Sequence, residues 1–161
     1  MTEKSIRARA PSASSPAVRR VMQAVLQRDT VPETRIRQAL HAIGLRFRKD
    51  YRPERDLKCK ADIVFRKQKI CIFIDGCFWH RCPLHFALPL SNSPWWDEKI
   101  QATVERDRRQ TKLLRSRGWC VIRVWEHEIT DAKIDRVVAR VRRKLIPSPS
   151  EYLRACRPPA T

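Results

Sequence analysis

The chain has 161 residues and a formal net charge of +18, from 35 Lys and Arg residues against 17 Asp and Glu residues. This length is typical of one domain with a modest core, and no apolar run reaches the ~20 residues of a membrane-spanning helix. The positive charge favours a polyanionic partner, usually nucleic acid, over a ribosome-bound or merely solubilised basic protein. Six cysteines without an export signal indicate reduced thiols and metal binding rather than disulfides.

We expect a single folded domain over residues 16–146. Residues 1–15 are basic, rich in Ser and Ala, and lack the apolar segment of a secretory signal, so we expect a disordered arm there. Residues 147–161 are rich in Pro and Ser and are expected to form a flexible tail. No internal repeat divides the domain.

The domain is predicted to open with two helices. Ser15-Pro16 is a typical helix start, and an apolar stripe that includes Met22 follows it. Thr30 and Glu33 have the spacing of a capping box and are predicted to begin a second helix, which ends at Gly44. The capping box alone accounts for Glu33 without any catalytic role.

Three strands and their turns are predicted next. Residues 45–51 form the first, and residues 61–65 and 69–74 pair as a hairpin around the turn at residues 66–68. After an irregular stretch, we predict a long helix from Trp95 to Arg117, a strand over residues 119–125 and a basic amphipathic helix over residues 131–145. This order predicts an α/β sandwich around a small mixed sheet.

A short loop after the second hairpin strand carries metal-ligand residues. Cys77, Cys82 and His85 lie close together in the sequence, and thiolate and imidazole ligands at such spacing are typical of tetrahedral zinc. The other cysteines lack ligand-like spacing. His80 lies between these ligands and is not explained by zinc, so we expect chemistry in this loop.

Acidic residues at apolar positions point to a catalytic site. Asp62 lies inside an apolar strand, where a charge is costly unless it is paired or bound to metal, although it could instead face solvent on the hairpin. Asp75 ends the next strand, and two carboxylates at adjacent strand ends are suited to Mg²⁺. Asp107 falls on the inward stripe of the long helix, where it could orient the His80 imidazole or pair with a neighbouring arginine.

The motifs together resemble the very-short-patch repair (Vsr) endonucleases, bacterial DNA mismatch nickases whose fold is related to type II restriction enzymes. The similarity spans about residues 18 to 130. The motifs that carry it are Asp29-Thr30-x-x-Glu33, Ala61-Asp62-Ile63-Val64-Phe65, Phe73-Ile74-Asp75-Gly76-Cys77-Phe78-Trp79-His80-x-Cys82-Pro83, Trp96-x-x-Lys99-Ile100, Glu105-Arg106-Asp107 and Gly118-Trp119-x-Val121-x-x-Val124-Trp125-Glu126.

The resemblance implies a three-layer, restriction-endonuclease-like sandwich with a structural zinc site and a Mg²⁺-dependent active site. By position it makes Asp62 the metal-binding catalytic acid, with the backbone carbonyl of Ile74 as a further Mg²⁺ ligand. It makes His80 the proton-transfer group with Asp107 behind it, and it adds Glu33 to the active-site set. Asp75 stands where the best-known family pattern has a histidine, and we expect it to bind Mg²⁺ directly.

The resemblance also completes the zinc site. It implies Cys77, Cys82, His85 and His127 as ligands, with His127 in place of a cysteine of the family pattern. Imidazole replaces thiolate in zinc sites without difficulty. Cys120 is the alternative fourth ligand, but it lies within a predicted strand, whereas His127 follows the end of that strand.

Three apolar residues are candidates for DNA contact. Phe78 and Trp79 form an aromatic pair on the metal-binding loop, where bulky apolar side chains are a liability unless they meet a partner. Apolar wedges between base steps open DNA most easily at a mismatch. The family places an aromatic wedge here and a methionine wedge on an N-terminal helix, which Met22 fits. All three could instead be core residues.

The implied activity is the nicking of one DNA strand 5′ of the thymine in a T·G mismatch, which arises when 5-methylcytosine deaminates. The alternatives are a Vsr-like nuclease of a mobile element or defence system without mismatch specificity, and a zinc-stabilised DNA-binding protein without catalysis. We expect a monomer that acts on double-stranded DNA in the bacterial cytoplasm, at the nucleoid, with repair helper proteins as further partners and no membrane.

Overall fold

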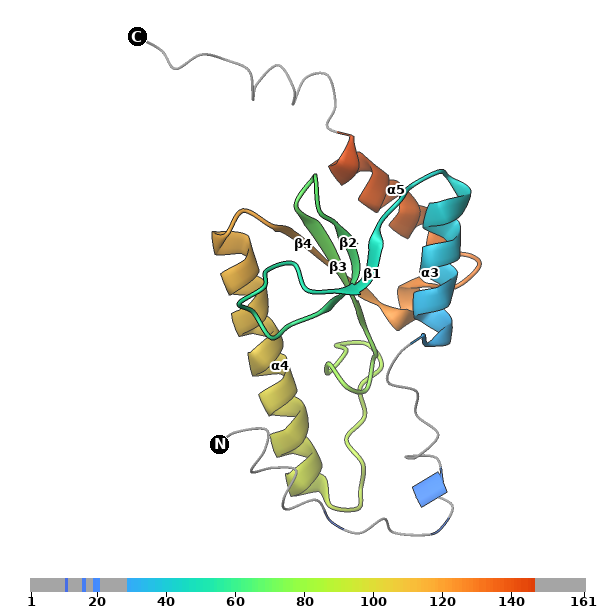
Figure 1. Cartoon of the computed structure of the whole chain (residues 1–161). Helices are drawn as coiled ribbons and strands as arrows, with labels where there is room; N and C mark the ends of the chain where they lie inside the picture. The colour runs from blue at the N-terminus through green and yellow to red at the C-terminus, as the bar shows by residue number, and fades with distance from the viewer. Residues whose placement is uncertain (1–10, 12–15, 17–18, 21–28, 147–161) are drawn as a thin grey trace.

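The computed structural model describes residues 29–146 together with positions 11, 16, 19 and 20 (Figure 1). Met22, the tail at residues 147–161 and nearly all of the predicted arm and first helix lie outside the described residues. Within the described part of the chain, no helix is long and apolar enough to cross a membrane.

The described elements follow the predicted order. They are α3 (Val31–Ala42), β1 (Arg48–Tyr51), β2 (Ala61–Phe65), β3 (Ile70–Asp75), α4 (Ser93–Ser116), β4 (Cys120–Trp125), the short 3₁₀ helix η1 (Glu126–Glu128) and α5 (Ile134–Leu145). The strand predicted from residue 45 begins only at Arg48, because Leu45 and Phe47 pack against the core before pairing begins. The last helix begins at Ile134 rather than at residue 131, after turns that bond to the Thr130 carbonyl.

The four strands form a mixed sheet in the order β1-β2-β3-β4. β1 pairs with β2 and β2 with β3 in antiparallel fashion, so the predicted hairpin is confirmed. β3 pairs with β4 in parallel, and α4 is the crossover between them. The predicted α/β class and mixed sheet are therefore confirmed.

Helices cover both faces of the sheet (Figure 1). On one face, α3 and α5 pack on a core that includes Ile36, Ile72 and Val141. On the other face, Leu114 of α4 packs on a second core that includes Phe73 and Val121. β3 contributes to both cores, since its residues alternate between them, and this explains its nearly uninterrupted apolar sequence.

The parallel register between β3 and β4 positions the candidate site. It sets Asp75 beside Trp125 at the carboxyl ends of both strands. The segment that carries Cys77 and His80 follows β3, and the segment that carries His127 follows β4. Two segments about fifty residues apart in the sequence therefore leave the sheet at the same edge.

Candidate functional site

His80 and Asp107 form a hydrogen-bonded pair beside the end of β3. The His80 Nδ1 lies 2.5 Å from the Asp107 Oδ2, and Asp107 is buried on α4. Although burial would raise the pKa of Asp107, the hydrogen bond with His80 and the charge of Arg123 bring it below its ordinary value. An ionised Asp107 orients the imidazole through Nδ1 and leaves Nε2 as the nitrogen for proton transfer. The structure thus brings together the two residues that we predicted to act as a pair.

Glu33, Asp50 and Asp62 form a second, separate group of acids. Each offers one carboxylate oxygen, and these oxygens lie within 4.8 Å of one another. The β1–β2 register pairs Lys49 with Ile63 and Tyr51 with Ala61, which places Asp50 opposite Asp62. Three carboxylates around one space form a donor set of the kind that Mg²⁺ prefers.

The environment of Asp62 favours a bound cation. Burial, followed by the negative charges of Glu33, Asp50 and Asp75, raises the pKa of Asp62 to about 6, against the opposing effect of a hydrogen bond. That bond comes from the backbone N–H of Ile74, 2.7 Å from the Asp62 Oδ2, which places Ile74 next to Asp62, while its carbonyl as a Mg²⁺ ligand stays a prediction. A cation among these acids would offset both the burial and the repulsion that favour the protonated carboxyl.

Glu33 connects its helix start to the acid group. Its carboxylate accepts hydrogen bonds from the Asp29 backbone N–H and the Thr30 hydroxyl, each at 2.9 Å. The predicted capping box is not formed, because the Thr30 side chain bonds to the Glu33 carboxylate and Glu33 accepts from the backbone of Asp29 rather than of Thr30. Glu33 is buried beside Asp62, so these contacts at the helix start also fix its position in the acid group.

Asp75 has a partner that the sequence did not suggest. Both of its carboxylate oxygens accept hydrogen bonds from Arg123, each at 2.6 Å. The same guanidinium donates to the Asp107 Oδ2 at 3.0 Å. Asp75 groups with His80 and Asp107 rather than with the acids around Asp62. Its assignment to Mg²⁺ stays a prediction, while the geometry shows it holding Arg123 behind the His80–Asp107 pair.

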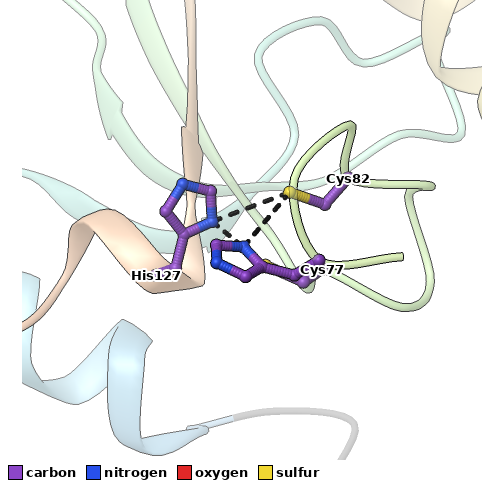
Figure 2. Close-up of side chains that lie close together, drawn as sticks. Cys77, Cys82 and His127 are labelled. Carbon is purple, nitrogen blue, oxygen red and sulfur yellow. Dashed lines mark hydrogen bonds between the residues drawn. The ribbon is translucent and has the colours of Figure 1, made fainter. Parts of the chain in front are cut away.

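Cys77, Cys82, His85 and His127 form a compact cluster at the edge of the sheet. Figure 2 shows Cys77 and Cys82 on one loop and His127 reaching them from the segment after β4. Ligand atoms of all four residues lie within 4.8 Å of one another. Cys120, the alternative ligand, belongs to β4 and packs against the core shared by α3 and α5.

The distances within this cluster fit tetrahedral zinc. Zinc bonds of ~2.3 Å to sulfur and ~2.0 Å to nitrogen separate the two ligand atoms by about 3.5 Å at a tetrahedral angle. The Cys77 Sγ lies 3.8 Å from the His85 Nδ1 and 3.1 Å from the His127 Nδ1. The corresponding distances from the Cys82 Sγ are 3.6 and 3.7 Å. The donor set and its spacing therefore suit one zinc ion.

The Cys77 thiol resists ionisation in the absence of a cation. Burial, followed by the neighbouring Cys82, raises the pKa of Cys77 to about 12. The Cys77 backbone N–H donates to Glu126 at 2.7 Å, which ties the loop to the segment that carries His127. A divalent cation would convert the thiols to thiolates and complete this connection.

Phe78 and Trp79 belong to an aromatic surface. Phe78 is half-buried against Trp96, with ring centroids 5.3 Å apart, whereas Trp79 is 36% exposed. Lys99 lies over the rings of Trp79, Trp95 and Trp96, at 5.4, 4.7 and 5.1 Å from their centroids. Trp79 is thus the more accessible of the two predicted wedges for contact with a ligand. Phe78 packs against the Trp79 ring, with centroids 5.1 Å apart.

The sequence analysis missed Asp50 and Arg123. Arg123 interrupts the apolar run Val121-Ile122-Arg123-Val124, so the reasoning that identified Asp62 could also have found it. Asp50 gave a weaker signal, because its strand is polar throughout and only the register with β2 brings it to Asp62.

Comparisons with known proteins show the family of the chain. A family model described as DNA mismatch endonuclease Vsr matches residues 14–84. The chain is 46% identical to the type II nicking enzyme V.NaeI of Lentzea aerocolonigenes over 74% of this chain and 73% of that protein. It is 40% identical to the type II nicking enzyme V.XorIIP of Xanthomonas oryzae pv. oryzae over 83% of this chain and 96% of that protein.

One further relative and one solved structure are also similar to the chain. The DNA mismatch endonuclease Vsr of Escherichia coli is 40% identical over 65% of this chain and 66% of that protein. Among solved structures, the catalytic domain of the homing endonuclease I-Bth0305I matches with a TM-score of 0.48 and 20% identity, over 72% of this chain and 94% of that one.

These relatives and the paired histidine and acids define a DNA endonuclease. The chain belongs to the Vsr family.

The fit of the Cys/His cluster to zinc predicts that variants of its ligands lose metal and stability together. Cys77→Ser or Cys82→Ser should abolish zinc binding and lower the melting temperature, because structural zinc contributes folding free energy directly. His127→Ala should do the same, whereas the control Cys120→Ala should retain zinc. Metal analysis of the purified variants beside thermal unfolding tests this. Folded parent protein without zinc would contradict it.

The Asp75–Arg123 pair predicts non-additive effects on stability. Arg123→Gln leaves the buried Asp75 carboxylate without its bidentate partner and should cost about 3 kcal/mol of unfolding free energy, whereas Asp75→Asn leaves Arg123 paired with Asp107 alone and should cost less. The double variant should cost clearly less than the sum, as urea unfolding would measure. Arg117→Gln, at the exposed pair with Asp56, is the control and should change stability little. Additive losses would show that the two side chains do not act as a unit.

Proposed function

We propose that this protein nicks one strand of double-stranded DNA on the 5′ side of the thymine in a T·G mismatch, and so initiates very-short-patch repair. The observation that carries the proposal is the His80–Asp107 pair beside the acids Glu33, Asp50 and Asp62 in a chain of the Vsr family. The mismatch specificity rests on the likeness to the Escherichia coli mismatch endonuclease and on the exposed Trp79.

The acid group fits a catalytic Mg²⁺ ion. Asp62, Glu33 and Asp50 would hold it, together with the Ile74 backbone carbonyl. When bound, Mg²⁺ supplies a Lewis acid that stabilises negative charge on the phosphodiester. The buried carboxylates fix the donor atoms before substrate arrives, so that little reorganisation is needed during reaction.

His80 moves the proton in this proposal. With Nδ1 held by Asp107, Nε2 exchanges a proton with the attacking water or the leaving oxygen. Arg123 keeps Asp107 ionised and in place through its own bond to that carboxylate. The zinc cluster fixes the loop that carries His80, since Cys77 and Cys82 flank it in the sequence.

The relatives support one alternative function. Several curated relatives are described as type II nicking enzymes rather than as mismatch endonucleases. A nuclease of a mobile element or defence system, acting without mismatch specificity, would use the same catalytic residues. A comparison of nicking on matched and T·G duplexes separates the two. For either function we propose that the enzyme acts as a monomer on bacterial chromosomal DNA at the nucleoid, with repair helper proteins as partners of the first.

Asp62→Asn tests the reaction. The parent protein with Mg²⁺ should nick a T·G duplex in one strand and leave 5′-phosphate and 3′-hydroxyl ends, as gel analysis of end-labelled DNA would show. The variant should lose nicking by at least about a hundredfold, because it removes a charged metal ligand, while it retains DNA binding. Unchanged nicking by the variant would contradict the assignment of Asp62.

The same variant has an internal control for folding. Because the pKa of Asp62 is raised in the folded protein, its protonated form favours folding and its ionised form opposes folding. The stability that the protonated form contributes is therefore lost as pH rises from about 4 to about 6. In Mg²⁺-free buffer at pH 7, Asp62→Asn should therefore be more stable than the parent by up to about 3 kcal/mol. The difference should close near pH 4. A variant that is inactive yet more stable cannot owe its inactivity to misfolding.

Trp79→Ala tests mismatch recognition. Stacking on a base is worth about 1–3 kcal/mol, so the variant should bind a T·G duplex roughly ten- to a hundredfold more weakly. Binding to matched DNA rests mainly on phosphate contacts and should change much less. Leu90→Ala, at a fully exposed apolar side chain, is the control for lost surface area. Equal losses on both duplexes would make Trp79 a general DNA contact.

A further inference from the structure

A groove of about 780 Å³ lies between α4 and the edge strand β4. Its lining includes Asp75, Arg123 and Trp125 from the sheet, together with His80 and Asp107 of the candidate site. Along its α4 wall lie three cationic residues, Arg108, Lys112 and Arg115. We refer to these three residues as the α4 basic row.

The α4 basic row has no partner within the described part of the chain. All three side chains are exposed, and none of them has a hydrogen bond or ion pair with any other described residue. Cations on a concave surface repel one another unless an anion lies between them. The groove therefore presents positive charge that the described residues leave uncompensated.

The other arginines of α4 differ from this row. Arg106 contacts Asp107, and Arg109 lies 4.0 Å from Glu105. Arg117, just after the helix, pairs with Asp56 at 2.7 Å. Among the arginines on and just after α4, those without a side-chain partner among the described residues are thus the ones that line the groove.

The acids in the groove do not cancel this charge. Asp75 accepts both of its short hydrogen bonds from Arg123, and Asp107 bonds to Arg123 and His80. Arg81, at the His80 end, pairs with Asp97. The acids in the lining are therefore paired, and the row remains the uncompensated part of the wall.

We propose that the α4 basic row binds successive phosphates of the DNA strand that is cut, beyond the phosphate that lies at His80. This inference rests on the proposed function, because it takes the reacting phosphate to lie at His80, which lines the same groove. At a rise of 1.5 Å per residue, Arg108 and Arg115 are about 10 Å apart along the helix. The same length of duplex axis carries about three phosphates of one strand.

The chemistry of the groove favours nucleic acid over an acidic protein segment. A strand that reaches His80 has to continue past it, and its phosphates would neutralise the row, which lines the same groove. The groove combines regularly spaced cations with acids whose charges are already paired. Such a surface suits a repeating anion such as the phosphate backbone, which is recognised by its charge and not by its base sequence.

The salt dependence of DNA binding tests the proposal. The probe is a matched duplex in Mg²⁺-free buffer, and the variant is Arg108→Gln/Lys112→Gln/Arg115→Gln. The slope of log K against log salt concentration is negative, and each lost phosphate contact reduces its magnitude by about 0.9. The slope of the triple variant should therefore be smaller in magnitude than that of the parent by about two to three. The matched control is Lys133→Gln/Arg136→Gln/Lys144→Gln, three exposed residues at α5.

The control has the same net charge as the variant, so a general charge effect would lower both slopes equally. A slope that falls only in the α4 variant supports the proposal. An unchanged slope, or an equal fall in the α5 control, overturns it and leaves an acidic protein partner for the row. The assay needs no cleavage, so the two proposals can fail separately. If the parent does not nick the T·G duplex but the magnitude of the slope falls in the α4 variant, the proposed reaction is rejected and phosphate binding by the α4 basic row is retained. If the parent nicks the T·G duplex but the slope of the variant is unchanged, the reaction is retained and phosphate binding by the row is rejected.

Discussion

The parallel pairing of β3 with β4 is the constraint on which the site depends. It aligns Phe73 with Arg123 and Asp75 with Trp125, so Arg123 lies within reach of the Asp75 carboxylate. The same register brings the loop after β3 to the segment after β4, where Cys77 meets His127. α4, which crosses between the two strands, then delivers Asp107 to His80. The Cys/His cluster, the His80–Asp107 pair and the groove all depend on this one strand pairing.

The two groups of buried acids differ in how their charge is balanced. Asp75 and Asp107 both form ion pairs with Arg123, and Asp107 is also hydrogen-bonded to His80. Glu33, Asp50 and Asp62 face one another, and burial, followed by the charges of the neighbouring acids, raises the pKa of Asp62. Such an unfavourable grouping of acids is typical of functional sites, and the binding of a catalytic cation would account for it here.

α4 connects three parts of the candidate DNA-binding surface. Its first turns carry Trp95 and Trp96 next to the exposed Trp79, its middle carries Asp107, and its last turns carry the α4 basic row. Aromatic rings suit unpaired or weakly paired bases, whereas cations suit phosphates. One rigid helix can therefore hold the base-contacting and the phosphate-contacting groups at a constant spacing from the His80–Asp107 pair.

The sequence by itself determined the elements, the α/β class, the cysteine and histidine loop, and the inward position of Asp107, since each depends on spacing along a single segment. The resemblance to the Vsr family added the roles of Asp62, Glu33 and His127. Only the tertiary structure decided that Asp50 joins Asp62 and that Asp75 is held by Arg123. Those contacts depend on strand register, and a register is a property of two segments that local periodicity cannot supply.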